Sequence, residues 1–215
     1  MTTDTFQRIK EHKLVAVIRG AKGDDVLSIA DALNEGGVHI MEITADTPQV
    51  DTLIRRVNEE FGDDMVVGAG TVLDPETART AIKAGASFIF SPTVNVETIQ
   101  MTKRYGVVSI PGALTPTEIL TAYEHGADLI KIFPAGTVGP NYIKDIHGPL
   151  PHIPLMPTGG VDLTNVREYF EKGAVAAGLG SSLVNTKRGV NPETLKDITD
   201  KARQFTETIK DVGQQ

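Results

Sequence analysis

Near its middle the chain reads Glu124-His-Gly-Ala-Asp-Leu-Ile-Lys-Ile132, and this stretch decides the fold. It combines the end of an amphipathic segment, a glycine and a short apolar run. Glycine tolerates the left-handed conformation that often ends a helix before a strand. The same pattern recurs at residues 34–43, 83–90, 104–110 and 171–177. The helix-closing glycines would then be Gly36 or Gly37, Gly85, Gly106, Gly126 and Gly173.

Helix starts are marked as clearly as helix ends. In four places a residue able to cap a helix precedes a proline, which is well tolerated at the first helical position. These pairs are Thr47-Pro48, Asp74-Pro75, Thr115-Pro116 and Asn191-Pro192. Glu118 stands three residues after Thr115, which is the spacing of a capping box. We therefore expect a helix to begin at each of the four prolines.

Between these signals lie eight apolar runs, spaced roughly 20–27 residues apart, which is room for one strand, one helix and two short loops. The runs end near Arg19, Thr44, Gly70, Phe90, Ile110, Ile132, Met156 and Leu179. Eight even units predict an α/β fold, a (β/α)8 TIM barrel with a short N-terminal helix, as one domain over residues 1–215. An open doubly wound sheet is the alternative.

Composition limits the classes of function. The 215 residues are 40% hydrophobic and 23% charged, which is ordinary for a globular protein. The net charge of -7 argues against nucleic acid as a partner. There is no cysteine, which excludes disulfides, thiolate metal sites and cysteine nucleophiles. No signal peptide or membrane span is evident, so we expect a cytoplasmic protein.

Three polar residues interrupt or end the apolar strands. Lys131 shares one face of its strand with Leu129, Glu42 shares one face of its strand with Ile40, and Arg19 closes the first strand. In a barrel, alternate residues point inward and the carboxyl ends of the strands face the active site. Burial makes the neutral, nucleophilic form of a lysine more accessible. We interpret Lys131 as the centre of the chemistry. A structural ion pair with Glu42 is the alternative.

Two glycine-rich turns follow the last two strands, at Pro157-Thr-Gly-Gly-Val161 and Gly178-Leu-Gly-Ser-Ser182. In barrels of this kind, loops after the seventh and eighth strands commonly bind phosphate through backbone N–H groups. The alternative is that these glycines only make tight turns. By contrast, Gly68-Ala-Gly70 lacks the third glycine of a dinucleotide-binding motif, and we interpret it as a turn at a strand end. The five histidines show no metal-ligand spacing.

A set of motifs in one order makes the chain resemble a known family. They are Met41-Glu-Ile-Thr44, Val67-Gly-Ala-Gly-Thr-Val-Leu73, Ser91-Pro92, Ile110-Pro-Gly112, Ile130-Lys-Ile-Phe-Pro-Ala135, Pro157-Thr-Gly-Gly160 and Gly178-Leu-Gly-Ser181. From about Leu14 to Val184 the chain resembles the 2-keto-3-deoxy-6-phosphogluconate / 4-hydroxy-2-oxoglutarate aldolases. The resemblance implies a homotrimeric class I aldolase with a phosphorylated keto-acid substrate and no metal or cofactor.

Carried over residue by residue, the resemblance makes Lys131 the Schiff-base lysine and Glu42 the general acid/base. It implies that Thr71 binds the pyruvyl carboxylate and that Pro92 and Phe133 shape the pyruvate pocket. The residues implied around the distal end and phosphate of the substrate are Thr158, Gly159, Gly160, Gly180 and Ser181.

One position departs from the family pattern. Some relatives carry an arginine four residues after the glutamate, where it contacts substrate, whereas this chain has Asp46. Arg19 is an available replacement as a substrate-binding residue, and a rim salt bridge to Asp46 is the alternative. Three other functions stay open: a 6-phosphogalactonate-derived substrate, a phosphate-binding barrel isomerase or epimerase, and a phosphometabolite-binding protein without catalysis.

Overall fold

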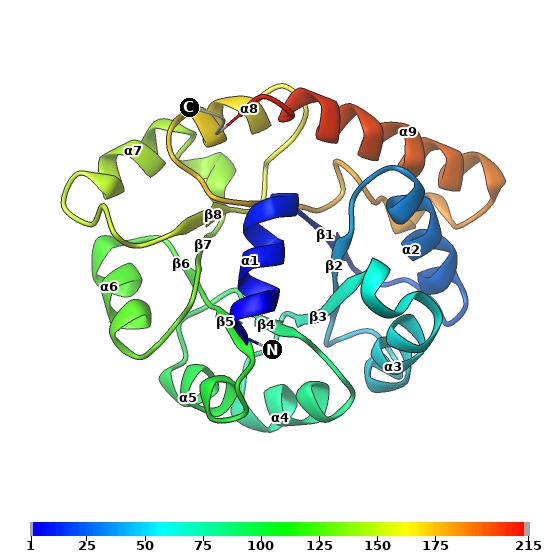
Figure 1. Cartoon of the computed structure of the whole chain (residues 1–215), viewed down its shortest axis with the longest axis horizontal. Coiled ribbons are helices and arrows are strands. Elements are labelled where there is room, and N and C mark those ends of the chain that lie inside the picture. The colour runs from blue at the N-terminus through cyan, green and yellow to red at the C-terminus, as the bar shows by residue number, and fades with distance from the viewer. Residues whose placement is uncertain (1, 213–215) are drawn as a thin grey trace.

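The computed structural model describes residues 2–212, in which helices and strands alternate (Figure 1). The strands are β1 (Leu14–Ile18), β2 (Ile40–Thr44), β3 (Val66–Gly70), β4 (Phe88–Phe90), β5 (Val108–Ile110), β6 (Gly112–Ala113), β7 (Ile130–Ile132), β8 (Leu155–Pro157) and β9 (Ala177–Leu179). The helices are α1 (Thr2–His12), α2 (Asp25–Glu35), α3 (Val50–Phe61), α4 (Pro75–Lys83), α5 (Val96–Arg104), α6 (Pro116–Glu124), α7 (Asn141–His147), α8 (Val166–Glu171) and α9 (Pro192–Thr208). Short 3-10 turns are η1 (Gly62–Asp64), η2 (Ala135–Thr137) and η3 (Thr186–Arg188).

All strand pairs run parallel, in two curled sheets surrounded by helices (Figure 1). One sheet has the order β5-β4-β3-β2-β1-β9 and the other β6-β7-β8. An isolated parallel bridge between Thr158 and Gly178 joins the end of β8 to β9. The alternating α/β architecture with a parallel sheet, expected from the sequence, is therefore present.

The predicted strand ends agree with the structure within one residue at all eight positions. The fifth run continues beyond Ile110 as β6, after an interruption at Pro111. Proline has no N–H to donate, which interrupts the ladder at that point. Its carbonyl still accepts a hydrogen bond from the N–H of Lys131 at 2.9 Å. The chain thereby passes from one sheet to the other while β7 stays attached.

Alternate residues of the strands form two separate cores. Buried side chains facing the helices form the larger core. A second cluster lies on the opposite face of the strands, which explains why the strands read as nearly continuous apolar runs. Its buried members are Ile9, Val15, Ile40, Val66, Phe88, Phe90, Val108, Ile110, Leu129, Met156 and Ala176.

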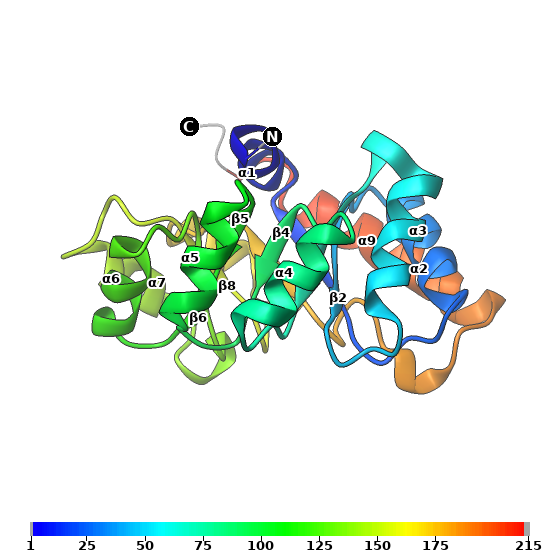
Figure 2. The ribbon, with the colours of Figure 1, turned by 90° about the horizontal axis from the view of Figure 1, so that it is seen from below.

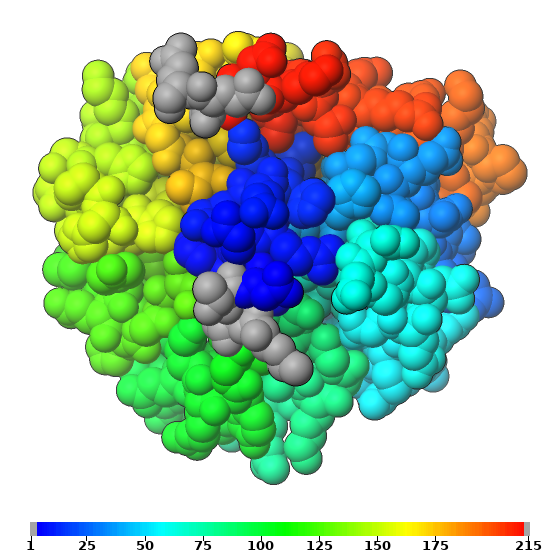
Figure 3. Space-filling view, in the orientation of Figure 1, coloured from blue at the N-terminus to red at the C-terminus, as the bar shows by residue number. Residues whose placement is uncertain are grey.

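Helix α1 covers the amino-terminal ends of the strands. Its Ile9 is fully buried in the second cluster, and Phe6 packs against the same cluster. Figure 3 shows α1 filling the middle of this face, and Figure 2 shows it at one end of the strands. The carboxyl ends of the strands open at the other end.

Three of the four predicted helix starts are confirmed. Asp74, Thr115 and Asn191 each accept a hydrogen bond from a backbone N–H of the first turn, and Glu118 completes the expected capping box. The start at Thr47-Pro48 was wrong, because α3 begins at Val50. The hydroxyl of Thr47 is buried 3.3 Å from the hydroxyl of Thr44, and Gln49 precedes the helix instead.

The predicted closing glycines are also confirmed. Five glycines at helix ends have positive φ angles, from 69° to 107°: Gly37, Gly85, Gly106, Gly126 and Gly173. Within residues 2–212, no helix has the length and apolar character needed to cross a bilayer.

Candidate active site

All eleven residues singled out from the sequence line one cavity of about 650 Å³ at the carboxyl ends of the strands. Lys131 and Glu42 come from β7 and β2 themselves. The others follow strand ends: Arg19, Thr71, Pro92, Phe133, Thr158, Gly159, Gly160, Gly180 and Ser181. Segments far apart in sequence meet here because parallel strands all end at one edge.

Lys131 is buried, with 6% of its surface exposed. Its Nζ lies 4.1 Å from the ring centroid of Phe90 and 4.5 Å from that of Phe133. Burial lowers its pKa to about 8, although the nearby Glu42 carboxylate acts in the opposite direction. About a tenth of the lysine is then neutral at pH 7, far more than for an ordinary lysine, and this fraction supplies the nucleophilic amine.

Glu42 is 1% exposed, and its Oε2 has no hydrogen-bond partner among the described residues. Burial raises its pKa to about 7, while Lys131 and Arg19 lower it and Asp46 raises it. The described structure contains no ion pair within 4.0 Å between Lys131 and Glu42. The alternative of a structural ion pair between them is therefore not what the structure shows. A carboxyl group with this pKa can both donate and accept protons near neutral pH.

Arg19 contacts both Thr71, which the resemblance assigns to the substrate carboxylate, and Asp46, its alternative ion-pair partner. Its guanidinium donates a hydrogen bond to the Thr71 hydroxyl at 2.8 Å and lies 3.4 Å from the Asp46 carboxylate. Thr71 has φ 54°, an uncommon conformation for a β-branched residue. Arg19 and Asp46 are both more than half exposed, so their ion pair contributes little to stability. The cationic group therefore reaches the cavity beside Thr71.

The two glycine turns form the opposite side of the cavity. Gly159 and Gly160 have φ angles of 81° and 82°, and a Cβ at Gly160 would lie 2.8 Å from Gly136. No hydrogen bond from the N–H of Gly160 or Ser181 is found among the described residues. Unpaired N–H groups in turns of this kind suit an anion.

The sequence did not single out several residues that shape this site. A Cβ at Gly70 would overlap the Glu42 carboxylate, and a Cβ at Gly178 would overlap the Thr158 side chain. Gly68 and Gly70 lie inside β3, so their interpretation as a strand-end turn was wrong. Ser182 donates to the Val161 carbonyl at 2.8 Å and joins the two glycine turns. Glycines inside a strand were the available signal for a close approach.

Thr158 presents a second unpaired polar atom. It is 4% exposed, and its Oγ1 has no hydrogen-bond partner within the described chain. A buried hydroxyl without a partner carries a desolvation cost that a ligand hydroxyl would offset. Within residues 2–212, the active site included, no group of three or more His, Asp or Glu side chains is arranged to hold a metal ion.

Comparison with known proteins shows the family of the chain. The family model described as KDPG and KHG aldolase matches residues 6–200. The chain is 42% identical over 162 residues to a 2-dehydro-3-deoxy-phosphogluconate aldolase of Pseudomonas aeruginosa, covering 75% of this chain and 73% of that protein. It is 36% identical over 178 residues to the 2-dehydro-3-deoxy-6-phosphogalactonate aldolase of Escherichia coli, covering 82% and 87%.

Among solved structures, the chain resembles a KDPG aldolase from Legionella pneumophila in which pyruvate was captured at low pH as a covalent carbinolamine intermediate. The TM-score is 0.81 at 29% identity, covering 89% of this chain and 92% of that one. Sequence, fold and cavity thus agree, and the chain belongs to the KDPG and KHG aldolase family.

Proposed function

We propose that this protein is a class I aldolase that cleaves 2-keto-3-deoxy-6-phosphogluconate to pyruvate and glyceraldehyde 3-phosphate. Cleavage of 4-hydroxy-2-oxoglutarate to pyruvate and glyoxylate is a second activity of the same site. The observation that carries the proposal is Lys131, a buried lysine without an ion pair in the described structure, at the base of a cavity with a carboxyl group and a glycine cradle.

The reaction begins with the neutral amine of Lys131, which adds to the C2 ketone of the substrate. Glu42 donates the proton that lets hydroxide leave the carbinolamine as water. The pKa of Glu42, about 7, makes the protonated carboxyl available for this step. The product is a protonated imine between Lys131 and C2.

The imine then acts as an electron sink. Glu42 accepts the proton of the C4 hydroxyl, the C3–C4 bond breaks, and glyceraldehyde 3-phosphate leaves. The bond electrons form an enamine on Lys131. Protonation at C3 and hydrolysis of the imine release pyruvate and return the amine.

The two ends of the substrate require different partners. Arg19 and Thr71 bind the carboxylate, for which arginine is suited because it is always charged. Pro92 and Phe133 flank the pyruvyl group. Thr158 donates to a substrate hydroxyl, and the phosphate binds the N–H groups of the cradle formed by Gly159, Gly160, Gly180 and Ser181.

A second candidate substrate is the C4 epimer, 2-keto-3-deoxy-6-phosphogalactonate, favoured by the 36% identity to the Escherichia coli enzyme of that name. The two epimers differ at a single hydroxyl, and such choices are set by contacts worth about 1–3 kcal/mol. An isomerase or epimerase, or a binding protein, would not need the buried Lys131 and Glu42.

Three further properties belong to the proposal. The strands close into one (β/α)8 barrel spanning residues 1–215, supported by the bridge between Thr158 and Gly178 and by the hydrogen bond from Val175 to Leu155 at 3.0 Å. The protein is a homotrimer, supported by the family resemblance and by exposed apolar side chains such as Leu73, and analytical ultracentrifugation tests this. It works in the cytoplasm, as the cysteine-free sequence suggests.

The test is covalent trapping of the imine. Borohydride with pyruvate should add one pyruvate-derived mass per chain, located on Lys131 by peptide mapping, and Lys131→Met should abolish it. Pyruvate release should then be measured on both epimers and on 4-hydroxy-2-oxoglutarate. An adduct on another lysine, or no adduct, would contradict the class I mechanism.

A further inference from the structure

A second cavity of about 630 Å³ adjoins the first at the carboxyl end of β9. Both cavities are lined by Val17, Arg19, Gly180 and Ser181. The outer wall of the second cavity is the loop that follows β9, residues 184–187. The proposed phosphate cradle at Gly180 and Ser181 therefore lies where the two cavities meet. The loop of residues 184–187 faces this cradle across the second cavity.

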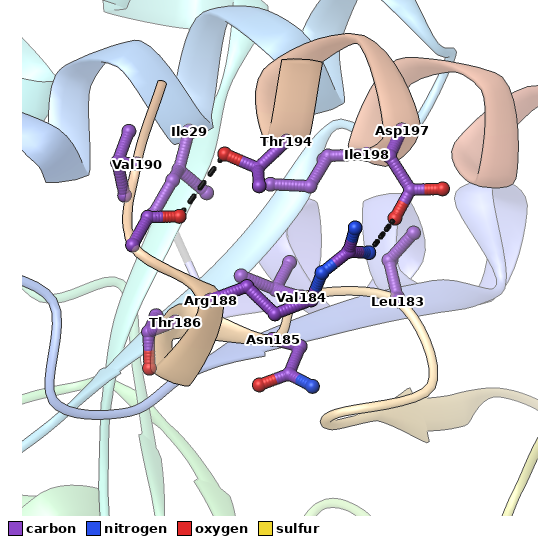
Figure 4. Close-up of a pocket in the computed structure, with 11 residues that line it drawn as sticks. Ile29, Leu183, Val184, Asn185, Thr186, Arg188, Val190, Thr194, Asp197 and Ile198 are labelled. Atoms are coloured by element: carbon purple, nitrogen blue, oxygen red, sulfur yellow. Dashed lines mark hydrogen bonds and ion pairs between the residues drawn. The ribbon is translucent and has the colours of Figure 1, made fainter. Parts of the chain in front are cut away.

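This loop is fixed on its other side by a set of polar contacts (Figure 4). Arg188 pairs with Asp197 of α9 at 3.1 Å, and the Thr194 hydroxyl donates to the Gly189 carbonyl at 3.0 Å. The Thr186 hydroxyl donates to the carbonyl of Arg19 at 2.7 Å, which ties the loop to the end of β1.

Apolar packing completes the anchor. Ile29 of α2 and Ile198 of α9 line the crevice behind the loop together with Val184 of the loop itself (Figure 4). The crevice left between the loop and α9 holds only about 10 Å³, at the lower limit for one water molecule. The backbone of the loop is thus held in place from behind.

Two adjacent cations, Lys187 in the loop and Arg188 directly after it, have different surroundings. Arg188 lines the crevice and pairs with Asp197, whose carboxylate also pairs with Lys201 at 3.0 Å. Lys187 lines the second cavity, and no carboxylate of the described chain lies within 4.0 Å of its ammonium group. Its backbone N–H donates to the Asn185 side chain at 3.2 Å, which fixes the start of the lysine side chain.

The charges around the cradle leave a phosphate without a cationic partner. The described cations lining the two cavities are Arg19, Lys131 and Lys187. In the proposed reaction Lys131 becomes the imine and Arg19 binds the carboxylate. Asp162 adds a negative charge on the cradle side, because hydrogen bonds from Thr164 lower the pKa of its carboxyl group.

We propose that the ammonium group of Lys187 pairs with the distal phosphate of the substrate across Gly180 and Ser181, and makes the enzyme prefer phosphorylated aldehydes. This proposal rests on the proposed aldolase function. Lys187 acts as a specificity residue, because its partner is far from the bond that breaks. Its contribution is electrostatic and lies near solvent, so it is sensitive to salt.

The experiment uses the synthetic direction, with pyruvate and either glyceraldehyde 3-phosphate or glyceraldehyde as acceptor. Lys187→Met should raise the KM for the phosphorylated acceptor roughly 5- to 50-fold, as expected for one lost hydrogen bond to a charged group. The KM for glyceraldehyde should stay within about twofold, and Lys187→Arg should keep most of the preference. Inorganic phosphate should inhibit the parent competitively and the Lys187→Met variant more weakly.

The control variant is Lys83→Met, which removes an equal charge from the last turn of α4. That turn lies at the amino-terminal end of the strands, so both acceptors should react as in the parent. Equal effects of Lys187→Met on the two acceptors, or no effect, would overturn the role of Lys187. Borohydride trapping on the same samples separates the outcomes, because loss of the pyruvate adduct in the parent would instead overturn the aldolase function.

Discussion

The carboxylate of Glu42 occupies the space into which a side chain at Gly70 would project. β2 and β3 are parallel neighbours, with Thr44 opposite Gly70. The buried carboxyl group therefore extends toward the end of the adjacent strand, where the absence of a Cβ makes room for it. The acid/base group proposed for this site depends on a glycine in another strand.

Gly70→Ala should reduce turnover while preserving the fold. The methyl group would displace a flexible carboxylate, and a misplacement of about 1 Å can lower a rate by about 10²-fold. Steady-state kinetics and thermal melting measure the two effects. In a Glu42→Gln background the same substitution should add little, because the displaced group is already lost. A further large loss in the double variant would mean that Gly70 acts on something other than Glu42.

Glu42→Gln should change the shape of the pH profile as well as the rate. In the parent, the pKa values of about 7 for Glu42 and about 8 for Lys131 predict a bell-shaped plot of kcat/KM against pH. Because the two groups interact, the apparent pKa values of its acid and alkaline limbs describe the coupled pair. The variant should be roughly 10²–10⁴-fold slower. Its activity should rise with pH to a plateau, because only Lys131 titrates, with a pKa below about 8 once the carboxylate is gone. If the pH profile of Glu42→Gln stays bell-shaped, a group other than Glu42 must be responsible for its second ionisation.

Lys131→Met should stabilise the protein at neutral pH. Burial lowers the lysine pKa from 10.5 to about 8, so the unfolded chain binds more protons between these values and stability rises with pH across that window. Below pH 8 the full destabilisation caused by burying the protonated lysine is present, on the order of 3 kcal/mol. In urea unfolding the variant should have a larger free energy of unfolding than the parent near pH 7, and this difference should shrink toward pH 10.5. A variant less stable than the parent at pH 7 would indicate that Lys131 is held by a stabilising ion pair.

The sequence could predict those features that follow from local chemistry. Strand ends, helix-closing glycines and the cap at Asp74 depend on a few neighbouring residues, and the structure agrees with them. Lys131 and Glu42 were identified because each interrupts an apolar strand. The start at Thr47-Pro48 failed, and there the Thr47 hydroxyl contacts the preceding strand end while Gln49 precedes the helix.

Features that depend on pairing between strands were not predictable from the chain alone. The role of Gly70 follows from the register of β2 against β3, because a glycine inside a strand indicates a close approach but not which side chain approaches. Lys187 is one of two adjacent cations, and only the tertiary pair between Arg188 and Asp197 distinguishes them. Register and packing, rather than propensity, determine both.

Thr158→Val should separate stability from activity. The hydroxyl has no partner in the described structure, and valine has nearly the same shape as threonine. The free energy of unfolding should therefore stay unchanged or rise slightly. If the hydroxyl binds substrate, kcat/KM should fall roughly tenfold, and unequally for the two C4 epimers. Thr98→Val is the matched control, because Thr98 in α5 also has a buried, unpartnered hydroxyl but does not line the cavity. Equal kinetics for Thr158→Val and the parent would remove Thr158 from the substrate contacts.

Arg19→Met tests whether this arginine supplies the charge that Asp46 cannot. An exposed ion pair contributes about 0–1 kcal/mol, so the melting temperature should change little. Loss of the guanidinium that contacts Thr71 should weaken pyruvate capture about tenfold, the size expected for one hydrogen bond to a charged group. The alkaline limb should also move to higher pH, because Arg19 lowers the pKa of Lys131.

Asp46→Asn separates the two roles of Arg19, since it removes the ion pair and leaves the hydrogen bond to Thr71. A substrate-binding arginine predicts that this variant captures pyruvate at least as well as the parent, because a carboxylate that competes for Arg19 is gone. The acid limb should shift to lower pH, because Asp46 raises the pKa of Glu42. Borohydride trapping at a series of pyruvate concentrations measures capture in both variants. If Arg19→Met and Asp46→Asn behave alike, the arginine serves the rim ion pair, and Thr71 with backbone N–H groups must bind the carboxylate alone.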